Sequence, residues 1–247
     1  AGFQPLARAV LRRDSRAARL IVRAELLPRI EQIPEADRRA LRHIIVVGGP
    51  AGAHPYPAYS LFEAEGSADL EAEPTSRDAP AFWLYSSGST GAPKGCVHLQ
   101  HDMVICAELF GKGVLGIRET DRCFSVAKLF FAYGLGNGLY FPFSVGATAI
   151  LWPGAPAAPN VYAVIEKHKP TLFYSVPTSY GMLLAHTGSY DLSSIRLAVS
   201  AGEALPAALY DRFKQRFGVD IVDGIGSTET RHMLSSTRPA GARPATR

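Results

Sequence analysis

Cysteine is scarce in this 247-residue chain, and the three that occur, Cys96, Cys106 and Cys123, fit neither a CxxC pair nor a zinc-ligand spacing. Their odd number and spacing argue against a disulfide framework, so we expect free thiols in a reducing cytoplasm. The sequence also lacks a secretory leader and any uninterrupted apolar run long enough to cross a bilayer. We therefore expect no membrane partner.

The chain also lacks a large net charge, since it has 26 Lys and Arg residues and 22 Asp and Glu residues. Much of the small positive excess comes from arginines near the two ends. A nucleic-acid groove would show basic residues alternating with aromatic ones, and the sequence has no such stripe, so we expect no nucleic-acid partner. Hydrophobic residues make up 47% of the chain, enough for the core of one large or two small domains.

Short β-branched or aromatic runs alternate with helix-length amphipathic segments, which predicts an α/β fold with a largely parallel sheet and helices on its faces. A helix is expected between Pro206 and Gly218, and another is expected to end before Pro170. The segment 48–80, rich in Gly, Pro, Ala and acidic residues, reads as a surface connection. The runs predicted as strands are 19–22, 43–47, 81–85, 123–127, 148–152, 171–176, 195–200 and 219–223.

Three unusual loops follow predicted strands: YSSGSTGAPKG (85–95), SAGEALP (200–206) and DGIGSTE (223–229). In an open α/β sheet, ligands bind outside the carboxyl ends of the strands. If the sheet is parallel at these positions, the three loops share one edge. The sequence therefore predicts a ligand site built from all three.

The first loop combines glycines, Ser and Thr hydroxyls, and Lys94. Glycines let backbone N–H groups turn towards an anion, hydroxyls donate further hydrogen bonds, and the lysine adds a mobile charge, a set suited to a polyphosphate. The loop is not a Walker A motif, because Gly95 rather than Ser or Thr follows Lys94, and the GxGxxG dinucleotide pattern is missing. The alternative is a Ser/Gly surface turn, which one such loop alone would favour.

The third loop places Glu229 beside Thr228. A carboxylate is a hard oxygen ligand for magnesium, and the neighbouring hydroxyl can contact a phosphate. The alternative is an acidic residue that stabilises a helix N-terminus, and for Glu229 taken alone that alternative is favoured.

In this order and at this separation, SSGSTGAPKG, SAGEALP and GIGSTE resemble the signature segments of AMP-forming acyl ligases. FWLYSSGSTGAPKG, FSVAKLFFAYGLGNGLYFPFSVGAT and DGIGSTE narrow the resemblance to benzoate-CoA ligases and their hydroxybenzoate relatives. The resemblance implies a fragment of the large N-terminal domain of an adenylate-forming enzyme, with partly parallel layered sheets and helices on the faces. It implies an enzyme of aromatic compound degradation that uses ATP, Mg2+ and coenzyme A to convert an aryl carboxylate to an acyl-adenylate and then to a thioester.

The same resemblance implies roles for individual residues. Thr228 would hold the α-phosphate and Glu229 the magnesium ion. Ile225 stands where most of the wider family has an aromatic residue, a departure shared with benzoate ligases. Phosphate binding would fall to Ser86, Ser87, Gly88, Ser89, Thr90, Gly91 and Lys94, and adenine binding to Ser200, Ala201, Gly202, Glu203, Asp223, Gly224 and Ile225.

The segment AKLFFAYGLG would lie along the acyl pocket, where apolar walls favour a flat ring. Composition alone favours the alternative of an ordinary buried strand and helix start. The pocket residues implied by the resemblance are Phe131, Ala132, Tyr133, Gly134, Gly226 and His232.

The resemblance covers residues 14–232, with a poorly matching start at 1–13 and a tail at 233–247 that we expect to be disordered or out of frame. The C-terminal domain of such enzymes, with its adenylation lysine, has no counterpart in the 247 residues, so we expect impaired activity. Two further hypotheses stay open: a non-catalytic nucleotide-binding remnant, and a ligase for another carboxylic acid. A phosphotransferase is disfavoured by the position of Lys94.

Overall fold

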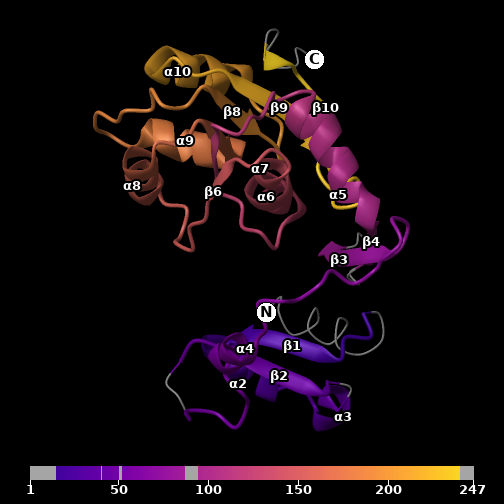
Figure 1. Ribbon diagram of the computed structural model, residues 1–247. Helices are drawn as coiled ribbons and strands as arrows, with labels where there is room; N and C mark the ends of the chain where they lie inside the picture. Colours follow the sequence, from indigo (N-terminus) through magenta and orange to yellow (C-terminus); the bar gives the residue numbers. More distant parts are fainter. Residues whose placement is uncertain (1–14, 40, 50–51, 87–93, 240–247) are drawn as a thin grey trace. The chain divides into compact units, whose positions relative to one another are not determined.

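The computed structural model describes residues 15–39, 41–49, 52–86 and 94–239 (Figure 1). They belong to two compact units, which are described separately. Unit 1 comprises Ala1–Thr75 and Tyr85–Gly95, and unit 2 comprises Ser76–Leu84 and Cys96–Arg247.

Unit 1 contains a parallel pair of strands, β1 (Arg19–Arg23) and β2 (His43–Val47), in register from Arg19 opposite His43. Apolar side chains from the strands and the short helices between them form its core: Val22, Leu27, Ile30, Ile33, Leu41 and Val46. The segment expected to be only a surface connection contains a helix, α4. The helical elements of this unit are η2 (Ala24–Leu26), α2 (Leu27–Glu31), α3 (Glu35–Arg38) and α4 (Tyr59–Glu65).

The strands that flank the first unusual loop, β3 (Pro80–Ser86) and β4 (Lys94–Leu99), form a two-stranded sheet of their own. The prediction that this loop follows a strand of the same sheet as the other two loops is therefore wrong. The physical reason is local, because β3 pairs with the next strand along the chain rather than crossing over to the large sheet.

Unit 2 is built on a six-stranded sheet in the order β10-β9-β8-β7-β5-β6. Strands β6, β5, β7, β8 and β9 pair in parallel, and β10 runs antiparallel to β9. This confirms the predicted α/β fold with a largely parallel sheet. The strands are β5 (Arg122–Ser125), β6 (Thr148–Ile150), β7 (Leu172–Ser175), β8 (Leu197–Ser200), β9 (Ile221–Gly226) and β10 (Met233–Ser236).

Helices cover both faces of this sheet, with α8, α9 and α10 on one side and α5, α6 and α7 on the other (Figure 1). Neighbouring strand residues face opposite cores, as Phe173 packs with the first group and Leu172 with the second. Burial on both faces explains why the central strands lack polar alternation. The helices are α5 (Gln100–Cys106) with the π-helical turn η3 (Ala107–Lys112), α6 (Ala132–Leu135), the π-helical turn η4 (Gly136–Tyr140), α7 (Phe141–Phe143), α8 (Ala158–His168), α9 (Pro177–Ala185) and α10 (Ala207–Phe217).

Both predicted helix ends are confirmed. Helix α10 stops at Gly218, whose φ of +70° suits glycine and whose N–H donates to the Lys214 carbonyl at 2.8 Å. Helix α8 stops at His168, just before Lys169 and Pro170. No helix in the described part of the chain is both long and apolar enough to cross a membrane.

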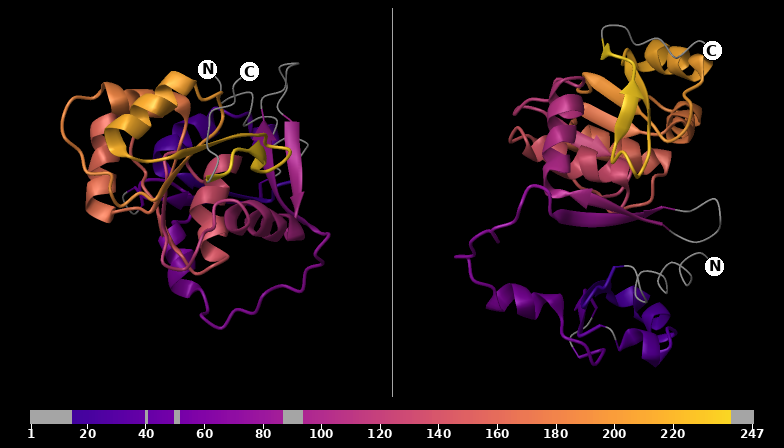
Figure 2. Two further views of the ribbon diagram at one scale, coloured as in Figure 1. Left: turned by 90° about the horizontal axis from the view of Figure 1, so that it is seen from above. Right: turned by 90° about the vertical axis from the view of Figure 1, so that its right-hand side faces the viewer.

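The segment after residue 232 corrects one expectation, because Met233–Ser236 forms strand β10 instead of a structureless tail. The two views of Figure 2 show this last strand beside the large sheet. Its backbone pairs with β9, with Ser235 opposite Ile225 and Ser236 opposite Gly224. Four residues give too short a pattern for a strand prediction, and the strand exists because the edge of β9 offers unpaired N–H and C=O groups.

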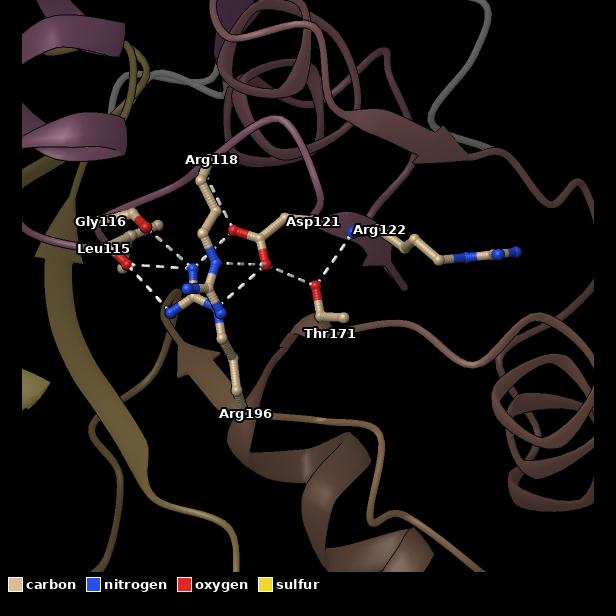
Figure 3. A network of polar contacts seen from close by, with 7 residues as sticks. All are labelled: Leu115, Gly116, Arg118, Asp121, Arg122, Thr171 and Arg196. Atoms are coloured by element: carbon tan, nitrogen blue, oxygen red, sulfur yellow. Dashed lines mark hydrogen bonds and ion pairs between the residues drawn. The ribbon is translucent and has the colours of Figure 1, made fainter.

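The amino ends of the strands are held together by a buried carboxylate, Asp121, which lies just before β5 (Figure 3). It accepts hydrogen bonds from the Arg196 guanidinium at 2.9 and 2.6 Å and from the Thr171 hydroxyl at 2.7 Å. Thr171 directly precedes β7 and Arg196 precedes β8 by one residue, so the network joins the amino ends of three strands. The carboxyl ends remain available for a ligand.

Candidate functional site

A cavity of about 470 Å³ lies at the carboxyl ends of β8 and β9. Parallel pairing puts Ser200 opposite Asp223, so the segments that follow are neighbours. Two of the three unusual loops therefore meet at one place, as the sequence predicts. The cavity is lined by Gly202, Glu203, Ala204, Leu205, Asp223, Gly224, Ile225, Gly226, Ser235, Ser236 and Thr237.

On the β8 side, the chain turns at Gly202, whose φ of +86° belongs to the left-handed region that glycine tolerates. Beyond the turn, the Thr178 hydroxyl donates its one proton to the Glu203 carboxylate, whose two oxygens lie 3.0 and 2.8 Å away. Ser200 and Ala201 are buried and do not line the cavity. Of the residues predicted to bind adenine, these two can act only by supporting the turn.

On the β9 side, Asp223 is held in place by Thr237, the residue that follows the strand that the sequence did not predict. Its backbone N–H donates to the Thr237 hydroxyl at 3.0 Å, and its carbonyl accepts from the Thr237 N–H at 2.9 Å. Burial raises the pKa of the Asp223 carboxyl, although backbone N–H groups of Leu205 and Gly224 and the Ser200 hydroxyl oppose that shift. The next residues, Gly224 and Ile225, lie within β9 rather than in a loop, and Ile225 is 70% exposed.

The turn that carries Thr228 and Glu229 is cross-linked by its own polar groups. The Ser227 N–H donates to the Thr230 hydroxyl at 3.0 Å, and that hydroxyl lies 3.1 Å from the His232 carbonyl. Thr228 is half-buried and Glu229 is exposed.

The Glu229 carboxylate fits a magnesium ion that arrives with a nucleotide. Among the described residues, no group of three or more His, Cys, Asp or Glu side chains could hold a metal ion. Magnesium prefers one or two carboxylates together with water and substrate phosphates. An exposed Glu229 beside the Thr228 hydroxyl matches that preference.

One of the predicted acyl-pocket residues, His232, is a buried histidine. His232 packs against the rings of Tyr133 and Phe141, with centroid separations of 5.1 and 4.6 Å, and its Nε2 lies 2.9 Å from the Asn137 Oδ1. Burial lowers the pKa of His232 to about 3, so the imidazole is neutral and donates to that amide oxygen. Phe131, by contrast, is 56% exposed.

Two glycines assigned to the acyl pocket have a structural reason to be glycine. A β-carbon on Gly134 would overlap the carbonyl oxygen of Lys128, and one on Gly226 would overlap the carbonyl oxygen of His232. Gly226 also lines the cavity at β9, while Ala132 opens helix α6. Close backbone packing is sufficient to explain glycine at both positions, and the role of Gly134 in the acyl pocket stays a prediction.

The predicted phosphate loop is described only at its two ends. Ser86 closes β3 and Lys94 opens β4, both in unit 1, whereas Glu229 is in unit 2. The grouping of Lys94 with Glu229 stays a prediction. The loop residues Ser87, Gly88, Ser89, Thr90 and Gly91 lie outside the described residues.

Sequence reasoning missed Thr178 and the hydroxyl-bearing residues 235–237. The run of three hydroxyl residues directly after a short apolar stretch was the available signal, but its meaning depends on pairing with β9. Thr178 lies 25 residues before Glu203, and no local pattern joins them.

Residues 1–246 match the family described as AMP-binding enzyme. Among curated relatives, the benzoate-CoA ligase of Thauera aromatica is 48% identical over 231 residues, which cover 91% of this chain and 42% of the relative. A 4-hydroxybenzoate-CoA/benzoate-CoA ligase of Rhodopseudomonas palustris is 43% identical and covers 92% and 42%.

Solved structures show the same similarity. An anthranilate CoA ligase, AuaEII, in complex with anthranoyl-AMP superposes with a TM-score of 0.92 at 45% identity, covering 98% of this chain and 47% of that one. A benzoate CoA ligase from Burkholderia xenovorans LB400 gives 0.85 at 39% identity with the same coverage. The chain thus spans less than half the length of these relatives.

Proposed function

The chain belongs to the family of AMP-binding enzymes, and we propose that it carries the nucleotide and acyl sites for ATP-dependent activation of benzoate or a similar aryl carboxylate. The product would be an acyl-adenylate and then a coenzyme A thioester. Family membership supports the use of ATP and coenzyme A, and the similarity to ligases for benzoate, hydroxybenzoate and anthranilate supports an aryl acid.

The observation that carries the proposal is the cavity shared by the turn after β8 and the end of β9. Its volume of about 470 Å³ lies within the range typical of small-molecule sites. The side chains of Glu203 and Asp223 and the turn at Gly202 offer polar groups around it, while Ile225 offers an aliphatic face. An adenine ring needs this combination of a flat apolar contact and a few polar groups at its edge.

The chemistry requires alignment and neutralisation of charge rather than a protein nucleophile. A carboxylate oxygen of the aryl acid attacks the α-phosphorus, and the bond from that phosphorus to pyrophosphate breaks. Thr228 would hydrogen-bond the α-phosphate, and Lys94 with the loop after Ser86 would bind the phosphates that leave. Magnesium, when bound, supplies positive charge that offsets the phosphate oxygens, and Glu229 would hold it.

The aryl ring would lie near Tyr133 and His232. The Tyr133 hydroxyl is engaged by the backbone carbonyls of Ser175 and Val199, at 3.3 and 3.1 Å, so Tyr133 can present only its ring. The neutral His232 adds no charge to this wall. Such a surface suits an uncharged ring and disfavours polar substituents that would lose water without finding a partner.

The domain boundaries and the cellular location are part of the same proposal. We propose that residues 14–232 form part of an N-terminal adenylation domain, with β10 added to it by its pairing with β9. None of the three cysteines, all of which the structure describes, forms a disulfide, which suits a cytoplasmic location.

Two measurements test the proposal. Calorimetric titration with MgATP should show binding, and isotope exchange between pyrophosphate and ATP in the presence of benzoate should show weak adenylation. Binding without any exchange across a panel of aryl acids would favour the non-catalytic nucleotide-binding alternative. The absence of MgATP binding would contradict both versions.

A further inference from the structure

Arg231, two residues after Glu229, has a combination of features that local structure does not explain. Its φ of +68° lies in the left-handed region, which non-glycine residues adopt only when their surroundings hold them there. Its side chain is only 13% exposed, so a guanidinium charge is buried beside the Thr228–Glu229 turn.

The buried charge is balanced by Asp102 in α5. Arg231 Nη2 lies 3.0 Å from Asp102 Oδ1, and the Asp102 side chain is itself 18% exposed. Arg231 Nε and Nη1 are buried without a hydrogen-bond partner in the described structure. The guanidinium therefore depends on this one carboxylate, and such a dependence makes a buried pair sensitive to the loss of either partner.

The Asp102 carboxylate is held in place by contacts other than the one with Arg231. Its Oδ2 accepts the N–H of Leu99 at 2.7 Å, which ties it to the end of β4 and the start of α5. His101 Nε2 lies 3.1 Å from Asp102 Oδ1, and His98 Nδ1 lies 3.9 Å from its Oδ2. Groups of β4 and α5 thus contact the carboxylate in addition to Arg231.

The Thr228–Glu229 turn is anchored by two residues that follow it, Arg231 and His232. The Arg231 N–H donates to the Thr228 carbonyl at 3.2 Å, and the next residue, His232, is fixed to Asn137 at 2.9 Å. Because Arg231 Nη2 lies 3.0 Å from Asp102 Oδ1, the turn adjoins the start of α5. Moving Arg231 would therefore move the two residues proposed to contact phosphate and magnesium.

We propose that Arg231 is a positioning residue that fixes the Thr228–Glu229 turn through its ion pair with Asp102, so that the Glu229 carboxylate is set for magnesium bound to a nucleotide. This inference rests on the proposed function of Glu229. It assigns no contact between Arg231 and the nucleotide.

The test compares the affinity of the 247-residue chain for ATP with Mg2+ and for ATP with EDTA. Arg231→Met and Asp102→Asn should each lower the ratio of the two affinities about tenfold or more, as the loss of a group that orients a metal ligand commonly does. Arg231→Lys keeps the charge and should retain most of the ratio. Asp191→Asn is the matched control, because it removes an exposed ion pair with Lys169 in the same unit.

A second readout separates positioning from nucleotide chemistry. Amide hydrogen exchange of residues 227–232 should be faster in Arg231→Met and Asp102→Asn than in the control, while circular dichroism stays unchanged. If Arg231→Met does not fold, Asp102→Asn alone decides the test.

Unchanged ratios and unchanged exchange in folded variants would overturn the inference while leaving the proposed function intact. Failure of the unmodified chain to bind MgATP would overturn the proposed function, and the positioning role would fall with it.

Discussion

The Thr178 hydroxyl lies 3.0 and 2.8 Å from the two carboxylate oxygens of Glu203, joining the start of α9 to the turn that follows β8. Glu203 lines the cavity proposed for adenine, whereas Thr178 does not. One helix thus orients a cavity residue that belongs to another element.

Thr178→Val removes the hydroxyl with almost no change of shape, and we expect it to weaken ATP binding roughly threefold to tenfold, equivalent to about 1 kcal/mol for one hydrogen bond. Calorimetric titration measures the change. Thr178→Ser keeps the hydroxyl and should bind ATP as the unmodified chain does. Equal affinities for the Val and Ser variants would show that Glu203 needs no such support.

Gly202→Ala should destabilise the turn beneath the cavity, because its φ of +86° is unfavourable for any residue with a β-carbon. We expect a loss of about 1 kcal/mol in the free energy of unfolding and weaker ATP binding. Gly181→Ala is the matched control, since Gly181 lies in α9 with open space around it, and alanine there should stabilise the helix. Denaturation followed by tryptophan fluorescence reports on unit 2, which holds both tryptophans, Trp83 and Trp152.

The buried His232 predicts how the stability of unit 2 depends on pH. Its folded pKa is lowered to about 3 from an ordinary value of 6.5. The folded state therefore loses stability as pH falls from 6.5 towards 3, because the unfolded chain takes up a proton that the folded chain excludes. His232→Gln can keep the hydrogen bond to Asn137 and should flatten the stability profile between pH 6 and pH 4. A profile as steep as that of the unmodified chain would contradict this assignment.

Asp121→Asn should destabilise unit 2 by about 3 kcal/mol, because it leaves the Arg196 guanidinium without its buried carboxylate (Figure 3). Chemical denaturation at neutral pH measures the change. Asp191→Asn removes an exposed ion pair and should change little. A loss in Asp121→Asn no larger than that control would show that the network does not hold the strand ends together.

Acid should act through the same network. Burial raises the pKa of Asp121, but hydrogen bonds from Arg196, Thr171 and the Arg118 N–H outweigh burial, so the pKa lies below its ordinary value of 3.8. The stabilising contribution of Asp121 is thus complete above that ordinary value and is lost as pH falls through the lower folded pKa. Denaturation below pH 4 should separate the unmodified chain from Asp121→Asn less than denaturation at neutral pH does.

The sequence by itself was sufficient to predict the α/β class, the central strands and the ends of α8 and α10. These features depend on short-range rules: buried strands are continuously apolar, and Gly218 or Pro170 ends a helix wherever it occurs. The same rules predicted that SAGEALP and DGIG lie close together, because neighbouring parallel strands have their carboxyl ends at the same edge of the sheet. The ordered motifs also indicated the family that the comparisons confirm.

Only the tertiary structure decided the rest. It paired β3 with β4 outside the large sheet, added β10 to β9, and so brought Ser235, Ser236 and Thr237 to the cavity. It also joined Arg231 to Asp102 and Thr178 to Glu203 across long stretches of chain. Local patterns specify how a segment prefers to fold, whereas edge pairing and buried charge depend on which unpaired groups two distant segments offer each other.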